Sequence, residues 1–473
     1  MKTILRGTGL QHEKLREHLL PGDGCEAVAI ALCGRHISNE RNILTIREIH
    51  LIPYDECSIR SPFRVTWSTE KLVPLLEKVR RTNGAILKIH SHPGGFPEFS
   101  RIDDEADQAL FPSVYGWFDE EYPHASSVML PNGEMFGRIV KPNGDFEEIS
   151  TIAVAGDNIH FWNSNKDKAN VPDFAQRHAQ AFGAGTFDIL RQLSIAVVGC
   201  SGTGSPVIEQ LARLGVKRLV IIDPDQVEWK NLNRILNTTT KDAKNGDFKV
   251  DVLAKSIEKM GTDTEVIPLP INLYNPEAVK AVAGCDMVFG CMDTVDGRHL
   301  LNRLSVFYNI PYIDVGVKLV ADGKGGIEQI CGSVHYLQPD RSSLMSRGLY
   351  TPERLYAESL KRQNPSEYEK QLREKYISGV QEERPAVISV NMQFAAMAVN
   401  EFLARIHQFR DDENGEFAVT MVSLTQSYTY HEKEGEPCKV LSHHVGRGDT
   451  VPLLDIPELS ECEYDLQQQE VMA

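Results

Sequence analysis

The sequence lacks the marks of a secreted, membrane or nucleic-acid-binding protein. Its nine cysteines are scattered with no CxxC pair, which is typical of reduced thiols and not of a disulfide framework. No apolar run approaches the ~20 residues that cross a bilayer, and charges interrupt the opening residues too early for a signal peptide. The net charge of −16 repels a phosphate backbone. We therefore expect a cytoplasmic protein with no membrane or nucleic-acid partner.

The length and the hydrophobic pattern predict two α/β domains. At 473 residues the chain is too long for one core, and 41% hydrophobic with 25% charged residues is typical of globular proteins. Short strands and helices alternate over residues 1–155, and the polar stretch 156–171 suits a linker. Strand–helix–strand order then predicts a largely parallel sheet over 172–445, followed by an acidic tail at 446–473.

A pair of histidines follows an apolar stretch in LKIHSHPGGFPEFSRIDDEAD, residues 87–107. Alternation along a strand points His90 and His92 to the same side, and Asp103 follows in the next segment. Two imidazoles and one carboxylate leave a tetrahedral zinc ion its fourth position for water, whose pKa then falls to ~7. A bare HxH is more often structural, but Pro93, Ser100 and Asp103 at these spacings favour a zinc site.

The pattern H-S-H-P-x6-S-x-x-D resembles the JAMM zinc metallopeptidases, also called the JAB or MPN family, over residues 1 to about 150. The resemblance implies an MPN-type α/β domain that cuts peptide or isopeptide bonds after the C-terminal glycine of ubiquitin-like proteins. It implies Glu26, in GCEAVAIALCG, as general acid/base, and Ser100 can stabilise the developing oxyanion. We expect Asp104, Glu105 and Asp107 to be solvated or helix-start charges and not ligands.

A glycine-rich loop follows the predicted strand SIAVVG in the second domain. Gly199, Gly202 and Gly204 let the backbone approach phosphates at a helix N-terminus, and Asp223 at the end of the next strand can bind ribose hydroxyls. These features alone also fit NAD binding by a dehydrogenase.

The sequence that follows this loop argues against a dehydrogenase. DPDQVEWKNLNR, GDFKVDVLAKSI and CDMVFGCMDTVDG resemble the ThiF/E1 superfamily of ubiquitin-like-protein activating enzymes, over residues 172 to 445. The resemblance implies that Asn231, Arg234 and Lys249 contact ATP phosphates and that Asp293 helps to hold magnesium. It also implies that Arg177 reaches ATP from a second subunit, and hence a homodimer. Cations around a triphosphate and a carboxylate for magnesium agree with this chemistry, and a hydride transfer would not need them.

Two departures from this family concern loop and metal residues. Ser201 replaces the second glycine of the usual loop. Relatives carry a structural zinc on two CxxC pairs, where this chain has Ser343, Ser346 and a single Cys438. The substitutions argue against a structural zinc in this domain.

A third departure concerns the thioester that activating enzymes form on a cysteine. The charged helical segment 352–385 has no cysteine. Cys331 is the nearest alternative, although we interpret it as a buried core thiol. Either the enzyme stops at the acyl-adenylate, or serine replaces its cysteine, with Ser343, Ser346 and Ser378 as the positions to check.

The sequence thus predicts a bifunctional enzyme of the bacterial type. One domain would adenylate the C-terminal glycine of a ubiquitin-like protein with Mg-ATP, and the other, a zinc isopeptidase, would hydrolyse the bond after that glycine. We expect an E2-like conjugating partner and a role in a bacterial antiviral defence system. Two alternatives stay open: loading and release of a sulfur carrier in cofactor or natural-product biosynthesis, and a scaffold in which both sites are inactive.

Overall fold

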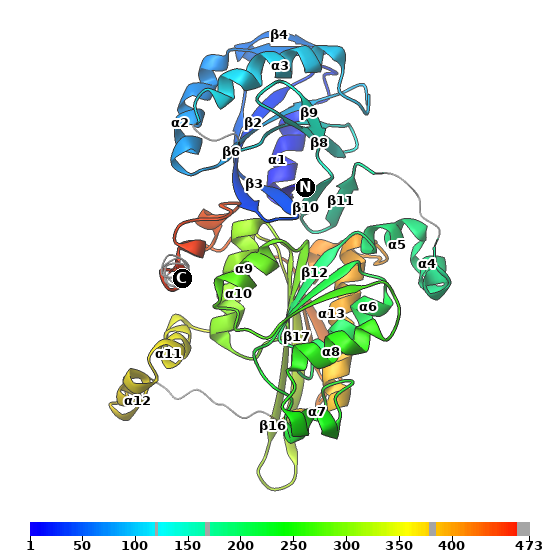
Figure 1. The fold of residues 1–473 in the computed structure, drawn as a ribbon, viewed down its shortest axis with the longest axis vertical. Coiled ribbons are helices and arrows are strands. Elements are labelled where there is room, and N and C mark those ends of the chain that lie inside the picture. Colours follow the sequence, from blue (N-terminus) through cyan, green and yellow to red (C-terminus); the bar gives the residue numbers. More distant parts are fainter. Residues whose placement is uncertain (119–121, 166–170, 378–384, 461–473) are drawn as a thin grey trace, which may run out of the picture. The chain divides into compact units, whose positions relative to one another are not determined.

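The structure is a computed structural model that describes residues 1–118, 122–165, 171–377 and 385–460 (Figure 1). The chain divides into two compact units. Unit 1 comprises the described residues of Met1–Asp167 together with Val306–Asn309 and His444–Asp455. Unit 2 comprises those of Lys168–Ser305, Ile310–His443 and Ile456–Ala473.

Unit 1 is built on a mixed nine-stranded sheet in the order β11-β10-β1-β3-β2-β6-β7-β8-β9. The strands are β1 (Lys2–Thr8), β2 (Val28–Ile37), β3 (Arg41–Leu51), β6 (Ala85–Ser91), β7 (His124–Met129), β8 (Met135–Val140), β9 (Phe146–Glu148), β10 (Thr151–Ala155) and β11 (Ile159–Asn163). A separate hairpin joins β4 (Cys57–Ser61) to β5 (Arg64–Trp67). β6 is antiparallel to β2 and parallel to β7, so it is a central strand.

Helices cover both faces of this sheet. α1 (Gly9–Leu19) packs its Leu15 and Leu19 with Ala29 and Ala31 of β2, whereas α2 (Val73–Arg81) and α3 (Arg101–Tyr115) pack on the opposite side chains of the same strand. The alternation of small and large side chains along β2 therefore serves two separate cores. α3 is the helix that follows the histidine motif.

The segment His444–Asp455 belongs to unit 1. The backbone N–H of Gly34 and the hydroxyl of Thr45 both donate to the carbonyl of Gly446, at 3.1 and 2.9 Å. This C-terminal segment thus hydrogen-bonds to β2 and β3, two inner strands of the sheet. The rest of the predicted tail, from residue 461, lies outside the described residues.

Unit 2 has an eight-stranded sheet in the order β14-β13-β12-β15-β16-β17-β18-β19. The strands are β12 (Ser194–Val198), β13 (Arg218–Ile222), β14 (Glu265–Leu269), β15 (Met287–Gly290), β16 (Tyr312–Ala321), β17 (Ile327–Leu337), β18 (Val419–Ser423) and β19 (Tyr428–Glu432). The first five strands in this order are parallel and the rest are antiparallel. The predicted α/β fold with a largely parallel sheet is confirmed.

The strand order reverses between β12 and β15, which places a ligand crevice beyond the carboxyl ends of these strands. The helices of unit 2 are α4 (Gln176–Phe182), α5 (Ala184–Leu190), α6 (Gly204–Arg213), α7 (Thr240–Asn245), α8 (Lys249–Glu258), α9 (Pro276–Ala283), α10 (Val295–Tyr308), α11 (Pro352–Gln363), α12 (Pro365–Arg373) and α13 (Ile388–Ile406). α13 packs against α6, β16 and β17. The charged segment forms α11 and α12, and the helix breaks at Asn364 because the next residue is proline.

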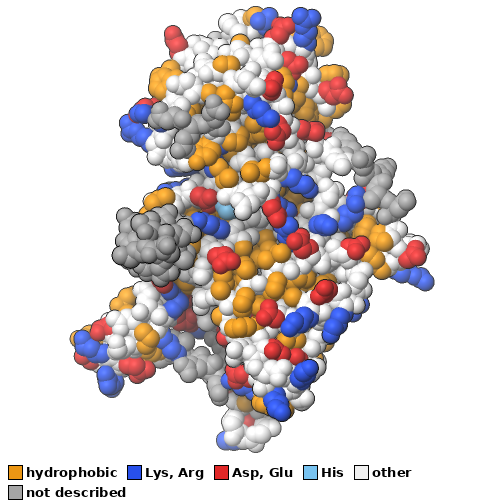
Figure 2. Space-filling model, in the orientation of Figure 1, with side chains coloured by type: hydrophobic (Ala, Val, Ile, Leu, Met, Phe, Trp, Pro, Cys, Tyr) orange, Lys and Arg blue, Asp and Glu red, His pale blue; other side chains and the backbone are white. Residues whose placement is uncertain are grey.

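None of the described helices is long and apolar enough to cross a membrane. The face shown in Figure 2 carries Lys and Arg side chains interspersed with Asp and Glu. No field of a single charge sign dominates this face.

Candidate functional site

Three side chains of unit 1 converge where β6 ends and α3 begins. The Nε2 atoms of His90 and His92 are 3.2 Å apart, and they lie 2.9 and 3.3 Å from the two carboxylate oxygens of Asp103. Ligands at 2.0–2.1 Å around a tetrahedral zinc ion are separated by roughly 3.3 Å. Within the described residues this is the one group of His, Cys, Asp or Glu with metal-binding spacing. The three side chains therefore fit zinc.

Hydrogen bonds orient these ligands. The Nδ1 atom of His92 lies 2.8 Å from the carbonyl oxygen of Phe96, so Nδ1 is the protonated nitrogen and the Nε2 lone pair faces the site. Burial opposes ionisation of Asp103, but the bonds from His90 and His92 lower the pKa of this carboxyl well below its usual range. Burial lowers the pKa of His90. A neutral imidazole and a carboxylate are the forms that bind zinc.

Ser100 is the N-cap of α3. Its hydroxyl oxygen accepts a hydrogen bond from the Asp103 N–H at 3.2 Å, and its own N–H donates to the Asp103 carboxylate at 2.7 Å. This capping box fixes the position of Asp103. The oxyanion role of Ser100 stays a prediction.

Glu26 precedes β2 and is buried beside the triad. Burial raises the pKa of its carboxyl to about 7, against the opposing effect of His92. The Glu26 N–H donates to the carbonyl of Ser61 on β4 at 2.9 Å, which ties this residue to the β4–β5 hairpin. A carboxyl with a pKa near neutrality can both accept and donate a proton at physiological pH. This property suits the predicted acid/base role.

Behind the triad lies an ion pair that the sequence reading missed. Asp107 is 0% exposed, lies 2.5 Å from the ammonium of Lys88 and accepts two bonds from Arg138 of β8 at 3.1 and 2.7 Å. The expectation that Asp107 is a solvated charge is therefore wrong. Asp107 follows Asp103 by one helical turn and Lys88 precedes His90 by two strand positions, so both face inward. The spacing of Asp107 from Asp103 on the helix and of Lys88 from His90 on the strand could have indicated this buried group from the sequence.

The nucleotide loop of unit 2 requires its glycines. Gly199 has φ +93°, and a Cβ on Gly204 would lie 1.8 Å from the Gly199 carbonyl oxygen. A Cβ on Gly202 would lie 2.3 Å from the side-chain nitrogen of Asn391. The loop therefore presents backbone rather than side chains, ahead of α6, which begins at Gly204.

A cavity of about 3000 Å³ opens over this loop. Its lining includes most of the residues predicted for this site, namely Gly199, Gly202, Asp223, Asn231, Arg234, Lys249 and Asp293. Arg177 is exposed on α4 and is not in this lining. Its predicted role involves a second subunit and stays a prediction.

Two carboxylates pair with Lys249, the lysine predicted to bind phosphate in this cavity. The Lys249 ammonium lies 2.6 Å from Asp225 and 3.4 Å from Asp223. Burial alone would lower the pKa of Lys249, but Asp223 and Asp225 raise it. Asp223 also accepts a hydrogen bond from the Cys200 N–H at 2.8 Å, which fixes the loop to the end of β13. Asp293 is exposed in the link between β15 and α10.

Among the thiols, Cys331 is half-buried on β17 and lines the same cavity. The interpretation of Cys331 as a buried core thiol is therefore wrong. Burial raises the pKa of both the Cys200 and the Cys291 thiols, which makes thiolates unfavourable there. Ser378 lies outside the described residues.

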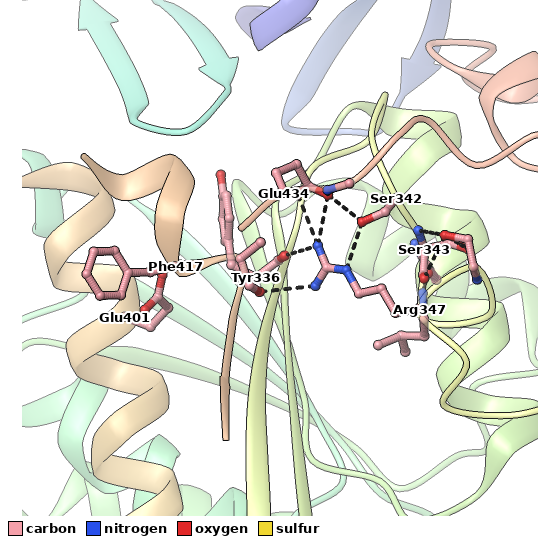
Figure 3. A network of polar contacts seen from close by, with 12 residues as sticks. Tyr336, Ser342, Ser343, Arg347, Glu401, Phe417 and Glu434 are labelled. Atoms are coloured by element: carbon pink, nitrogen blue, oxygen red, sulfur yellow. Dashed lines mark hydrogen bonds and ion pairs between the residues drawn. The ribbon is translucent and has the colours of Figure 1, made fainter. Parts of the chain in front are cut away.

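Ser343 belongs to a polar network, shown in Figure 3, and Ser346 is hydrogen-bonded to it. The Ser343 hydroxyl lies 3.1 Å from the Cys438 sulfur, and its N–H donates to Ser346 at 2.8 Å. Next to it the Arg347 guanidinium binds Glu434 at 3.0 Å and donates to two backbone carbonyls. Hydrogen bonds and one buried ion pair thus join the segment that carries Ser343 and Arg347 to the segment that carries Glu434 and Cys438.

Two family models match the chain. The model of the ThiF family matches residues 175–440, and that of the prokaryotic homologs of the JAB domain matches residues 11–136. Both resemblances expected from the sequence are thereby confirmed.

Curated relatives match part of the chain. The adenylyltransferase and sulfurtransferase UBA4 of Meyerozyma guilliermondii is 32% identical over 134 residues, which cover 28% of this chain and 31% of that protein. The SAMP-activating enzyme E1 of Haloferax volcanii is 34% identical over 119 residues, covering 25% and 43%. The sulfur carrier protein adenylyltransferase of Thermus thermophilus is 31% identical over 124 residues, covering 26% and 45%. The chain spans less than half the length of these relatives.

Among solved structures, the microcin C7 biosynthetic enzyme MccB in complex with N-formylated MccA is 18% identical, with a TM-score of 0.45. The likeness covers 59% of this chain and 77% of that chain. E. coli MccB with ATP is 18% identical with a TM-score of 0.43, covering 58% and 76%.

Proposed function

Because the chain belongs to the ThiF family, we propose that unit 2 adenylates the C-terminal carboxylate of a ubiquitin-like or sulfur-carrier protein. The observation that carries the proposal is the shared cavity: the glycine loop, the predicted phosphate-binding cations Arg234 and Lys249, and the exposed Asp293 carboxylate line one crevice. Curated relatives named as adenylyltransferases and as an E1 support the same chemistry. A dehydrogenase has no use for this set of cations.

The reaction is a transfer of AMP to the carrier. A carboxylate oxygen of the carrier's last glycine bonds to the α-phosphorus of ATP, and the bond from that phosphorus to pyrophosphate breaks. Backbone N–H groups of the loop and the N-terminus of α6 would bind the phosphates. Lys249 and Arg234 would neutralise negative charge on them. Asp293 would hold magnesium, which screens the triphosphate charge when bound.

For unit 1 we propose hydrolysis of the peptide or isopeptide bond after the same terminal glycine. His90, His92 and Asp103 would hold zinc, which supplies an acidified water and polarises the carbonyl when bound. The Glu26 carboxylate would take a proton from the attacking water and return it to the nitrogen of the leaving amine. The Ser100 hydroxyl would donate to the oxyanion. One chain would then hold a charging and a clipping activity.

The same proposal includes the partners. A homodimer would bring Arg177 of one subunit to the ATP of the other, and an E2-like enzyme would receive the activated carrier in a bacterial defence system. A sulfur-carrier role is the second candidate, favoured by relatives named sulfurtransferase and sulfur carrier protein adenylyltransferase. A carrier found attached to lysine side chains supports the first role, and a carrier found as a thiocarboxylate supports the second.

The test for unit 2 is ATP–pyrophosphate exchange by purified protein with a candidate carrier that ends in glycine. We expect exchange that requires the carrier and is lost in Asp293→Ala. A carrier without its last glycine is the matched control. Exchange that survives Asp293→Ala, or that no carrier supports, contradicts adenylation by this cavity.

A further inference from the structure

α11 is attached to the first turn of α10 by a buried carboxylate. Glu358 is 7% exposed, and its Oε2 atom accepts hydrogen bonds from the backbone N–H groups of Val295 and Asp296, at 2.5 and 3.2 Å. These are the first two residues of α10, whose N–H groups have no partner within the helix. A side chain from a distant helix thus caps α10.

The side chain of Asp296 makes a second set of bonds to the same helix. It accepts from the Ser359 hydroxyl and from the Arg362 guanidinium of α11, each at 2.6 Å. The Tyr274 hydroxyl donates to it at 2.7 Å, and the Arg362 guanidinium stacks over the Tyr274 ring at 3.3 Å. The first turn of α10 therefore has backbone and side-chain contacts with α11.

This attachment lies next to the magnesium residue of the proposed function. Only residues 291–294 link β15 to α10, and Asp293 is one of them. At the start of this link the Cys291 N–H donates to the Val198 carbonyl at 2.8 Å. At its end, Glu358 holds Val295. A link this short between two fixed points leaves its backbone little freedom.

The carboxylate of Glu358 also occupies a helix N-terminus that would otherwise attract an anion. A helix N-terminus attracts an anion, and Glu358 already occupies that of α10. The N-terminus of α6 at the glycine loop, in contrast, has no side-chain cap. The Asp293 link therefore leads into a helix N-terminus that a carboxylate already occupies.

We propose that Glu358 and Arg362 are positioning residues of the adenylation site: through the first turn of α10 they hold Asp293 where it binds magnesium. The inference rests on the proposed function and deepens it. It gives α11 a part in ATP activation, since a displacement of this helix would release the Asp293 link. Neither side chain needs to touch ATP.

The test measures the magnesium dependence of ATP binding by titration calorimetry and of ATP–pyrophosphate exchange. In Glu358→Ala we expect the magnesium concentration for half-maximal exchange to rise about 10- to 100-fold, the range for loss of a group that orients a metal ligand. ATP binding without magnesium should be unchanged. Glu358→Gln keeps an acceptor for both N–H groups and should recover most of the magnesium affinity. Glu369→Gln, an exposed glutamate on α12, is the control.

Arg362→Met provides a second route, since it removes the bond to Asp296 and leaves Glu358 in place; it also removes the ion pair of Arg362 with Glu458. We expect a smaller rise in the same magnesium concentration. If Glu358→Ala does not fold, Arg362→Met decides the question. An unchanged magnesium dependence in folded Glu358→Ala, or in Arg362→Met where Glu358→Ala does not fold, overturns the positioning role. A wild-type protein that binds no Mg-ATP overturns the proposed function instead.

Discussion

The metal triad of unit 1 and the nucleotide cavity of unit 2 are organised in opposite ways. The triad comes from two neighbouring elements, is buried, and holds its ligands within 3.3 Å of one another. The residues predicted to bind the nucleotide lie in loops and helices spread between residues 199 and 293 of the cavity lining, and Asp293 is exposed. The ligand atoms of the first site lie at metal-binding spacing. The carboxylate predicted to hold magnesium in the second site is exposed on the link between β15 and α10.

The two sites also differ in the charges that surround their key side chains. The carboxylate of the triad faces two histidines, whereas the lysine of the cavity is paired with two aspartates. A triphosphate entering the cavity must compete with these aspartates for Lys249, and magnesium reduces the resulting repulsion. We therefore expect changes in the triad to act as all-or-none losses. Loss of one phosphate-binding cation from the cavity should have a graded effect.

The largest effect is expected from a substitution in the triad. His92→Ala removes one of three ligands and should abolish both bound zinc and hydrolysis of a glycine-terminal fusion. Glu26→Gln is the matched variant: it should keep zinc and slow hydrolysis by about 10²- to 10⁴-fold. Metal analysis of both proteins separates the roles. Zinc that remains bound at full stoichiometry in His92→Ala would be evidence against the triad.

Lys249→Met probes the cavity and should have a graded effect. Loss of one charged donor to the phosphates should reduce ATP–pyrophosphate exchange by about 10²-fold. Part of that loss comes from Asp223 and Asp225, which remain without their cation. Hydrolysis by unit 1 in the same sample is the internal control. An exchange rate equal to that of the wild type would show that the phosphates bind elsewhere.

The buried ion pair behind the triad should affect stability more than chemistry. Asp107→Asn leaves Lys88 buried without its carboxylate partner and leaves Arg138 with Asp104 alone. Breaking a buried pair in this way costs about 3–5 kcal/mol. Glu105→Gln is the control, since its exposed pair with Arg101 is worth about 0–1 kcal/mol. Thermal unfolding of the two variants gives the difference. Equal midpoint temperatures of unfolding for Asp107→Asn and Glu105→Gln would mean that water solvates the Asp107 site.

The smallest effect is expected from Cys331→Ser. Adenylation needs no thiol, so exchange should match that of the wild type. If Cys331 forms a thioester with the carrier, the wild type should form a carrier conjugate that added thiol cleaves. Cys331→Ser should not form this conjugate. Persistence of such a conjugate in Cys331→Ser excludes Cys331 as the nucleophile.

How far the sequence could predict each site depends on how local the site is. The metal triad lies within one strand–loop–helix stretch, so its spacing was readable, and the glycine loop was readable because its backbone excludes side chains. The Lys88–Asp107–Arg138 group was missed because a single acidic residue near a helix start is usually solvated. Glu358 was missed because it meets residues 62 and 63 positions away. No local pattern marks a cap supplied by another helix.

The most direct test of two independent activities in one chain is a cross of two variants against two assays. Wild type, His92→Ala and Asp293→Ala are each assayed for ATP–pyrophosphate exchange with the carrier and for cleavage of a glycine-terminal fusion. We predict that His92→Ala loses only cleavage and that Asp293→Ala loses only exchange. If wild type cleaves the fusion but supports no exchange with any carrier, unit 2 is a docking platform and the central claim is wrong.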